Sequence, residues 1–588
     1  MILGELVGYY QRKTATDPNA IAPEGWIRRP IDYFMVLSRE GKCLDIAENT
    51  VQQKKRKVAK EELVPSIGKQ SLKHTNSGKD ANLLWDNAAF ALGYGAKGAD
   101  KLTHFMAEID RYFPGIEDDA LAALRAFLLG LQEKGALALL LEHFGLKETF
   151  ATREPIIAFR WQPDNGIAIH QRQNLVATYA NSRATAMAQV YGDCLVSGNG
   201  NVPIALNETV IKNVRAAQTA GANIVSYNKR AFESYGKRER AGENSPISIE
   251  TSFAYTTALN HLLRFDSPQR IQVGDATTVF WSDATNSLED DFAVFFDEPL
   301  KGDADPDRGA RAVAALFESA KQGVGPALDD QTRFFVLGLA PNSARIAIRF
   351  WHVGNVAEMA GRIIRHFRDL EMVWLPDKKQ KENGFLPITR LLKAIAAQEK
   401  IENVPPNLGG EVMRAILEGA PYPETLLHGA IRRIRAGEPV SYPRAAILKA
   451  CLNRTRNSSE EKIKMSLDPS NTHPGYRLGR LFAVLERIQE EAAGGHGKIN
   501  ATIRDRFYGA ASSTPASVFP LLLRLKNHHL GKIENVGRRK NLESLLGEIV
   551  DGLPPRFEPH LSMDGQGRFA VGYYQQRVHP YTYGKQGD

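Results

Sequence analysis

The sequence predicts an α+β protein in which a mixed α/β N-terminal region precedes a mostly helical region and a C-terminal helical bundle. Short runs rich in β-branched and aromatic residues occur before Val356, whereas helical spacing of apolar residues dominates after it. A chain of 588 residues is long enough for several domains. We expect four regions, with bounds at 1–150, 151–345, 346–464 and 465–588.

The first region contains signals for both strands and helices. Leu3, Leu6 and Tyr10 have helical spacing and predict a short first helix. Two strand-like runs, Asp32–Leu37 and Cys43–Ile46, are separated by a turn and predict a β-hairpin. Positions 100–145 are rich in leucine at helical spacing and predict helices that pack into a core.

The second region predicts further strands and one helix. Ser245 followed by Pro246 is typical of an N-cap and first helical position, and predicts a helix through Leu263. The expected strands are Ile156–Trp161, Ile167–His170, Thr277–Trp281, Phe292–Phe296, Arg333–Leu339 and Ala344–Trp351.

The C-terminal region follows a polar linker at Asn453–His473. Apolar residues of the stretch Leu478–Ile488 recur with helical spacing, which predicts a helix ending near Gly494. Thr514 and Pro515 predict the start of another helix, and Gly552 the end of a third. Bundle packing of these helices is the simplest expectation.

Composition restricts the class of protein and its compartment. The formal net charge of +8 and the pI of about 9.1 permit nucleic-acid binding. The three cysteines are far apart and form no CxxC pair, so we expect a reducing cytoplasm and no zinc motif. We also expect no signal peptide and no membrane-spanning helix, because no long apolar run is present.

The stretch Cys194–Ser248 combines basic residues, amides and aromatic rings. Cations neutralise phosphates, amides bond to sugar or base edges, and rings stack on bases. On composition alone, a loop-rich subdomain whose Asn and Gly residues serve turns is equally compatible. The candidate contact residues of this stretch are Lys212, Arg215, Gln218, Lys229 and Arg230.

A second basic segment lies at Lys54–Lys79, where only Glu61 and Glu62 oppose eight lysines and arginines. Its second half is rich in Gly, Ser and Thr, which indicates a loop that fits a phosphate backbone. A solvated surface loop is the usual alternative for an isolated run of charge. The candidate DNA-binding residues here are Lys69, Lys73, Asn76 and Lys79.

The sequence lacks the common catalytic motifs. It contains no phosphate-binding GxxxxGK[ST], no His-Asp dipeptide, no HExxH and no GxSxG. The acidic triplet Glu289–Asp291 has the chemistry to hold Mg²⁺, but three consecutive acids more often form a solvated turn. We therefore expect no catalytic residue, metal or cofactor.

Several blocks in the same order resemble the large subunit of the type I-C CRISPR Cascade complex, a Csd-type family. They span nearly the whole chain, at Asn82–Gly95, Ile211–Ser248, Phe253–Arg264, Arg349–Met372, Tyr476–Gln489, Phe507–Leu525 and Gly567–Arg577.

The resemblance implies a non-catalytic subunit of an RNA-guided surveillance complex. Such a subunit recognises the protospacer-adjacent motif in duplex DNA, aids R-loop formation and recruits the helicase-nuclease, while guide pairing reads the target. The implied partners are the CRISPR guide RNA, double-stranded target DNA, the Cascade backbone and guide-capping subunits, and the helicase-nuclease. A stand-alone metal-dependent nuclease acting through Glu289–Asp291, or a purely structural assembly subunit, are the alternatives.

The resemblance also implies that a small subunit is made from an internal translation start in the same gene. Met465 follows the polar linker and precedes the C-terminal helices, so it is the expected start. Within 465–588, a basic surface for the displaced strand is expected from Arg477, Arg480, Arg487, Arg504, Arg506, Arg538 and Arg539.

Overall fold

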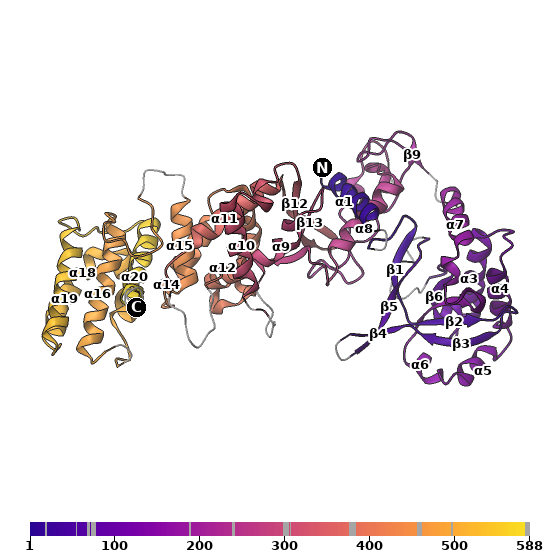
Figure 1. The fold of residues 1–588 in the computed structure, drawn as a ribbon, viewed down its shortest axis with the longest axis horizontal. Coiled ribbons are helices and arrows are strands. Elements are labelled where there is room, and N and C mark those ends of the chain that lie inside the picture. The colour runs from indigo at the N-terminus through magenta and orange to yellow at the C-terminus, as the bar shows by residue number, and fades with distance from the viewer. Residues whose placement is uncertain are drawn as a thin grey trace. The chain divides into compact units, whose positions relative to one another are not determined.

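The computed structural model resolves the chain into two compact units (Figure 1). It describes all residues except 18–19, 54–55, 68–70, 72–77, 187–189, 228, 238–240, 298–304, 306, 375–383, 455–460, 496–497 and 583–588. The first unit comprises Met1–Asn213, Ala217–His261 and Asn342–Ile346, and the second comprises Val214–Ala216, Leu262–Pro341 and Ala347–Asp588. The predicted four-region division is finer than these two units and stays a prediction.

Two larger sheets lie in the described part of the first unit, together with a short antiparallel pair of strands, β8 (Tyr191–Gly192) and β9 (Val202–Pro203). The first has the order β1-β5-β4 and is antiparallel, from strands β1 (Trp26–Ile31), β4 (Thr50–Gln53) and β5 (Arg56–Pro65). The second has the order β3-β2-β7-β6, with β2 (Tyr33–Leu37), β3 (Cys43–Glu48), β6 (Trp85–Asn87) and β7 (Ile156–Trp161). The β2–β3 pair is antiparallel, which confirms the predicted hairpin, whereas β2 and β7 are parallel.

Helices cover the second of these sheets and supply most of its core. Phe105 of α3 packs near Phe159 of β7, and Leu124 of α4 is fully buried in the same cluster. Burial of such side chains is the main stabilising term of this unit. Its α-helices are α1 (Ile2–Thr16), α2 (Ala88–Ala91), α3 (Gly98–Tyr112), α4 (Asp119–Gly130), α5 (Ala136–His143), α6 (Lys147–Thr152), α7 (Gln173–Ala186) and α8 (Ile249–Leu262).

Two predictions for this unit are wrong in detail. Ile167–His170 is not a strand, because η3 (Ile169–Gln171) is a turn of 3-10 helix that buries Ile169 and His170. Helix α8 begins at Ile249 and not at Pro246. The hydroxyl of Ser248 accepts a hydrogen bond from the backbone N–H of Thr251 at 3.1 Å, so Ser248 caps the helix in place of Ser245.

The third large sheet has the order β10-β11-β12-β13. Its strands are β10 (Arg270–Val273), β11 (Ala276–Ser282), β12 (Arg333–Asn342) and β13 (Arg345–Asn355), as predicted for the last three. Phe292–Phe296, in contrast, is not a strand but the end of helix α9 (Ser287–Phe296). The side chain of Asn286 caps α9 by accepting from the N–H of Glu289 at 3.1 Å. Helix α10 (Arg308–Gln322) packs against α9.

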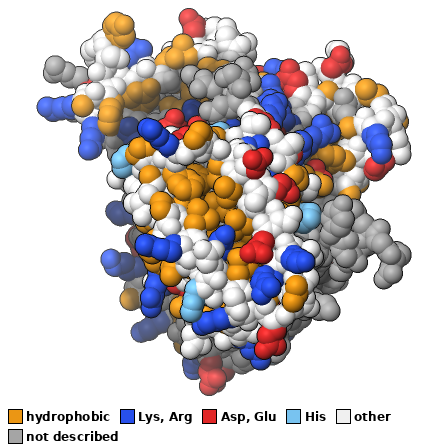
Figure 2. All heavy atoms as spheres, turned by 90° about the vertical axis from the view of Figure 1, so that its left-hand side faces the viewer, with side chains coloured by type: hydrophobic (Ala, Val, Ile, Leu, Met, Phe, Trp, Pro, Cys, Tyr) orange, Lys and Arg blue, Asp and Glu red, His pale blue; other side chains and the backbone are white. Residues whose placement is uncertain are grey.

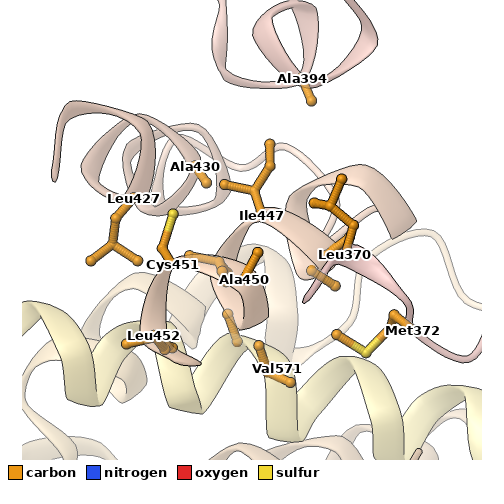
Figure 3. Packing of buried hydrophobic residues seen from close by; sticks show 14 of the residues in the cluster. Leu370, Met372, Ala394, Leu427, Ala430, Ile447, Ala450, Cys451, Leu452 and Val571 are labelled. Atoms are coloured by element: carbon orange, nitrogen blue, oxygen red, sulfur yellow. The ribbon is translucent and has the colours of Figure 1, made fainter. Parts of the chain in front are cut away.

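One continuous core connects the remaining helices of the second unit. Figure 3 shows Ile447, Ala450 and Leu452 of α15 between neighbouring helices, with Val571 of α20 beside them. These helices are α11 (Val356–Leu370), α12 (Ile388–Ile395), α13 (Leu408–Glu418), α14 (Glu424–Arg435), α15 (Tyr442–Asn453), α16 (Pro474–Ala492), α17 (Ile503–Ser513), α18 (Pro515–Leu530), α19 (Val536–Asp551) and α20 (Met563–Thr582). None of the helices in the described ranges is both long and apolar enough to cross a bilayer.

Helices α16 and α20 approach each other unusually closely. A Cβ atom on Gly479 would lie 2.0 Å from the carbonyl oxygen of Phe569, and one on Gly572 would lie 2.2 Å from that of Tyr476. Beyond this contact, Arg577 donates two hydrogen bonds, of 2.7 and 3.0 Å, to the carboxylate of Glu490. Backbone proximity and a bidentate ion pair therefore hold the two helices together.

Candidate nucleic-acid interface

The two ends of the stretch Cys194–Ser248 are hydrogen-bonded to each other. The N–H of Ser248 donates to the Sγ of Cys194 at 3.3 Å, and the N–H of Leu195 donates to the carbonyl of Pro246 at 2.9 Å. Burial raises the pKa of Cys194, but hydrogen bonds to its sulfur, including those from Ser197 and Ser248, lower that pKa to about 6. The two ends of the stretch are therefore fixed side by side, and the residues between them form a loop-rich excursion.

A half-buried glutamate organises the middle of this excursion. Glu208 accepts hydrogen bonds from the N–H groups of Ile224 and Val225 at 2.8 and 3.2 Å, and from the hydroxyl of Tyr255 at 2.5 Å. Burial raises the pKa of Glu208, while these donors act in the opposite direction. Since Tyr255 belongs to α8, the loop is anchored on a helix.

A second anchor on α8 holds the loop that carries Lys212, Arg215 and Gln218. Asn260 accepts from the N–H of Lys212 at 2.9 Å and donates to the carbonyl of Val210 at 3.1 Å. Arg215 and Gln218 are exposed. Lys212 is half-buried, and burial lowers the pKa of its ammonium group, with a contribution from Arg29. Arg215 and Gln218 are thus accessible to a ligand, and Lys212 is less so.

Lys229 and Arg230 lie at the start of η4 (Arg230–Phe232) and are exposed. Arg345 supports this turn by donating a hydrogen bond to the carbonyl of Ser226 at 2.7 Å. The guanidinium carbon of Arg345 also lies 4.0 Å from the centre of the Phe232 ring, a cation–π contact. Two adjacent cations are therefore presented on a supported turn.

Several amides of the stretch serve the loop itself. Asn223 donates to the carbonyl of Glu208 at 3.2 Å, and Asn244 contacts the backbones of Ser234 and Lys237. Asn201 and Asn213 have φ values of +51° and +65°, which amide residues tolerate better than most. These Asn residues therefore form turns and hold the loop backbone. At these positions the turn-forming interpretation, which composition left open, is correct.

The basic segment at Lys54–Lys79 is described only in part, and its first half contains strand β5. Lys69, Lys73 and Asn76 lie outside the described residues. Lys79 is exposed. The assignment of this loop to DNA therefore stays a prediction.

The predicted arginine surface of the C-terminal helices divides into two groups. Arg480 is 2% exposed and donates to Gln576 at 3.0 Å, to the carbonyl of Pro469 at 3.2 Å and to Glu548 at 3.3 Å, so its expected surface position is wrong. Arg477 and Arg504 are half-buried and donate to backbone carbonyls. Their guanidinium groups therefore make hydrogen bonds within the protein.

The remaining arginines are more accessible. Arg506 and Arg538 are exposed, and Arg538 donates to Glu491 at 2.5 Å. Arg487 and Arg539 are half-buried. Figure 2 views this end of the molecule and shows Lys and Arg side chains around a central group of hydrophobic ones. Exposed apolar side chains of α18 and α19 are Leu525, Val536 and Val550.

The three acids Glu289–Asp291 lie in helix α9 but have different surroundings. Glu289 points inward, is 4% exposed, and accepts hydrogen bonds from Ser282 at 2.7 Å and from Gln269. All three acids lie in helix α9, so the expected turn is wrong. The expected solvation holds for Asp290 and Asp291, which are exposed, and not for Glu289. Within the described ranges, no group of three His, Cys, Asp or Glu side chains is arranged to hold a metal ion.

The residues that organise the candidate interface were not identifiable from the sequence. Glu208 lies 47 positions from Tyr255, and Asn260 lies 48 positions from Lys212. No local motif relates such residues. Only the excess of amides in a basic stretch indicated that polar side chains would organise it.

A comparison with family models gives a match over residues 6–581 to the family described as CRISPR-associated protein (Cas_Csd1). No curated protein matches the chain. The family match covers nearly the whole length and includes both compact units. The chain therefore belongs to the CRISPR-associated Csd1 family, in agreement with its resemblance to the large subunit of type I-C Cascade.

Proposed function

We propose that this protein is the non-catalytic large subunit of a CRISPR surveillance complex, and that it binds target duplex DNA at the protospacer-adjacent motif. The match to the Csd1 family over residues 6–581 carries this proposal. The exposed cations Lys79, Arg215, Lys229 and Arg230 support it, because phosphate contacts supply most of the affinity of such proteins. In this role the chain aids R-loop formation and offers a docking surface to the helicase-nuclease.

The basic loop provides the first test. Replacement of Lys69, Lys73 and Lys79 by Ala in the assembled complex removes three phosphate contacts. We expect weaker binding to every duplex and a log–log salt slope lower by about two to three. Filter binding or gel shifts across a salt series measure both quantities.

The control is a triple variant with the same charge change elsewhere in the same unit. Lys42, Lys134 and Lys147 are exposed and lie outside the proposed interface. Their replacement by Ala should leave the slope within experimental error. Equal slopes for the two triple variants and the unmodified complex would contradict the assignment and favour a purely structural subunit.

Asn76 is proposed to contact a base edge. An amide reads a base through paired hydrogen bonds, worth about 1–3 kcal/mol of discrimination. Asn76→Ala should therefore relax preference among motif sequences while the salt slope stays the same. Binding to a library of duplexes with a randomised motif measures this preference, and an unchanged preference would refute the contact.

A further part of the proposal is a separate small subunit translated from Met465. Met465 is exposed and precedes α16, the first of the C-terminal helices. Expression of the untagged gene followed by intact-protein mass spectrometry should show a product beginning at Met465. Met465→Leu with a weakened upstream ribosome site should remove it. Full-length protein alone in an assembled, DNA-binding complex would refute the internal start and leave the large-subunit assignment standing.

A further inference from the structure

Tyr235 has a left-handed backbone conformation that aromatic residues rarely adopt in turns. The N–H of Lys237 donates to the carbonyl of Ser234 at 3.1 Å, and the two residues between them have φ values of +51° (Tyr235) and +71° (Gly236). Positive φ at both central positions defines a type I′ turn, where Gly, Asn and Asp dominate. Gly236 fits this requirement, whereas an aromatic side chain at Tyr235 strains the backbone.

The ring of Tyr235 gains no packing in return for this strain. Its side chain is 97% exposed, the most exposed of the large hydrophobic residues in the described part of the chain. Burial is the usual contribution of an aromatic ring to stability, and here it is absent. The fold therefore does not account for a tyrosine at this position.

The turn itself is held firmly. Asn244 accepts from the N–H of Ser234 at 3.0 Å and donates to the carbonyl of Lys237 at 3.3 Å. The ammonium of Lys237 donates to the carbonyl of Glu243 at 2.7 Å. These contacts fix the backbone on both sides of Tyr235, so the ring projects from a preorganised support and loses less backbone freedom on binding a ligand.

The chemistry around this turn favours a nucleobase as the ligand. The exposed cations Lys229 and Arg230 precede this turn in the chain. Phe232, whose ring contacts Arg345, is 39% exposed. Exposed rings next to phosphate-binding cations are the combination that binds unpaired nucleotides, and stacking tolerates any base because every base has a π face.

We propose that Tyr235 stacks on a base of the target DNA where the complex opens the duplex. This inference rests on the proposed function, and it adds a specific residue and a specific contact to it. The phosphate contacts of Lys229 and Arg230 would position the strand, and the ring of Tyr235 would hold one base out of the duplex stack.

The test uses the assembled complex with guide RNA and target duplexes that carry 2-aminopurine at successive positions in and beside the motif. Opening of the duplex unstacks this base and should raise its fluorescence, except at the one position where stacking on the tyrosine ring keeps it quenched. Tyr235→Gly removes the ring and also relieves the left-handed backbone, so the variant should fold at least as stably as the parent. Tyr235→Phe keeps the ring.

We expect Tyr235→Gly to bind target duplex about tenfold more weakly and to lose the quenching, while Tyr235→Phe retains both within about twofold. Tyr191→Ala is the matched control, because Tyr191 is also exposed, at 56%, but has an ordinary backbone conformation. Unchanged affinity and quenching in Tyr235→Gly would overturn the proposal. Failure of the unmodified complex to bind target DNA would instead refute the proposed function.

Discussion

His366 is a fully buried histidine of α11 in the core of the second unit. Its Nδ1 lies 2.6 Å from the hydroxyl of Tyr422. Burial, together with the nearby Arg454, lowers the pKa of His366 to about 3. An unfolded histidine takes up a proton near pH 6.5, so the unfolded state binds more protons between these two values. Stability is therefore greatest above pH 6.5 and is lost as the pH falls toward 3.

We predict that this histidine removes about 2 kcal/mol of stability between pH 7 and pH 5. His366→Gln should unfold with a smaller difference in melting temperature between pH 7 and pH 5 than the parent protein. His428→Gln, at an exposed position of α14 in the same unit, should keep the parental difference. The same pH dependence in His366→Gln and the parent would show that other groups control acid unfolding.

Individual residues also show where sequence reasoning about the site reaches its limit. The basic character of Lys229 and Arg230 and the turn-forming role of many amides follow from residue type and neighbourhood. The burial of Arg480 does not, because it depends on Gln576 and Glu548, which lie 96 and 68 positions away. An arginine with helical neighbours is exposed more often than not, and only the packing of α16 against other helices reverses this.

At the scale of elements, strands β2, β3, β7, β11, β12 and β13 were predicted from their apolar and β-branched runs, whereas the sheet β1-β5-β4 was not predicted. Helices α16, α18 and α19 were predicted from apolar residues at helical spacing and from their end signals. Phe292–Phe296 was not, since a short apolar run fits a buried strand and a buried helix equally well. The preceding residues contained the deciding signal. Asn286 followed three positions later by Glu289 is a helix-start pattern. Asn286 makes the expected cap contact to the N–H of Glu289, whereas the Glu289 carboxylate accepts from Ser282 instead of returning to the cap.

The contact between α16 and α20 gives a prediction for elements. A Cβ atom on Gly479 would lie 2.0 Å from a backbone oxygen of α20, a distance that side-chain movement does not relieve. Gly479→Ala should therefore destabilise the protein by about 3 kcal/mol, through separation of the two helices.

The matched control is Gly547→Ala in α19. A Cβ atom there would meet no atom within 4 Å, and alanine favours a helix more than glycine does. This variant should be more stable by about 0.5–1 kcal/mol. Chemical denaturation of the two variants measures both changes, and a Gly479→Ala protein as stable as the parent would show that the helices separate at little cost.

For the molecule as a whole, the important feature is that the C-terminal helices share their core with the helices before them. A Cβ atom on Gly567 of α20 would lie 3.2 Å from Leu452 of α15, and Figure 3 shows Val571 of α20 beside the same helix. The amide of Gln575 donates to the carbonyls of Lys464 and Met465 at 2.9 and 3.3 Å. A product beginning at Met465 therefore loses the partners of one face of α20.

We predict that the isolated fragment 465–588 folds less stably than the same helices in the full chain, and exposes the α15-facing side of α20. Apolar surface removed from water contributes about 25 cal/mol per Å², so its exposure lowers the melting temperature and increases binding of a hydrophobic dye. A fragment beginning at Met413 retains α14 and α15 and is the control. If 465–588 melts as high as 413–588 and binds no more dye, α20 is stable without α15, and a separate small subunit needs no partner to cover this face.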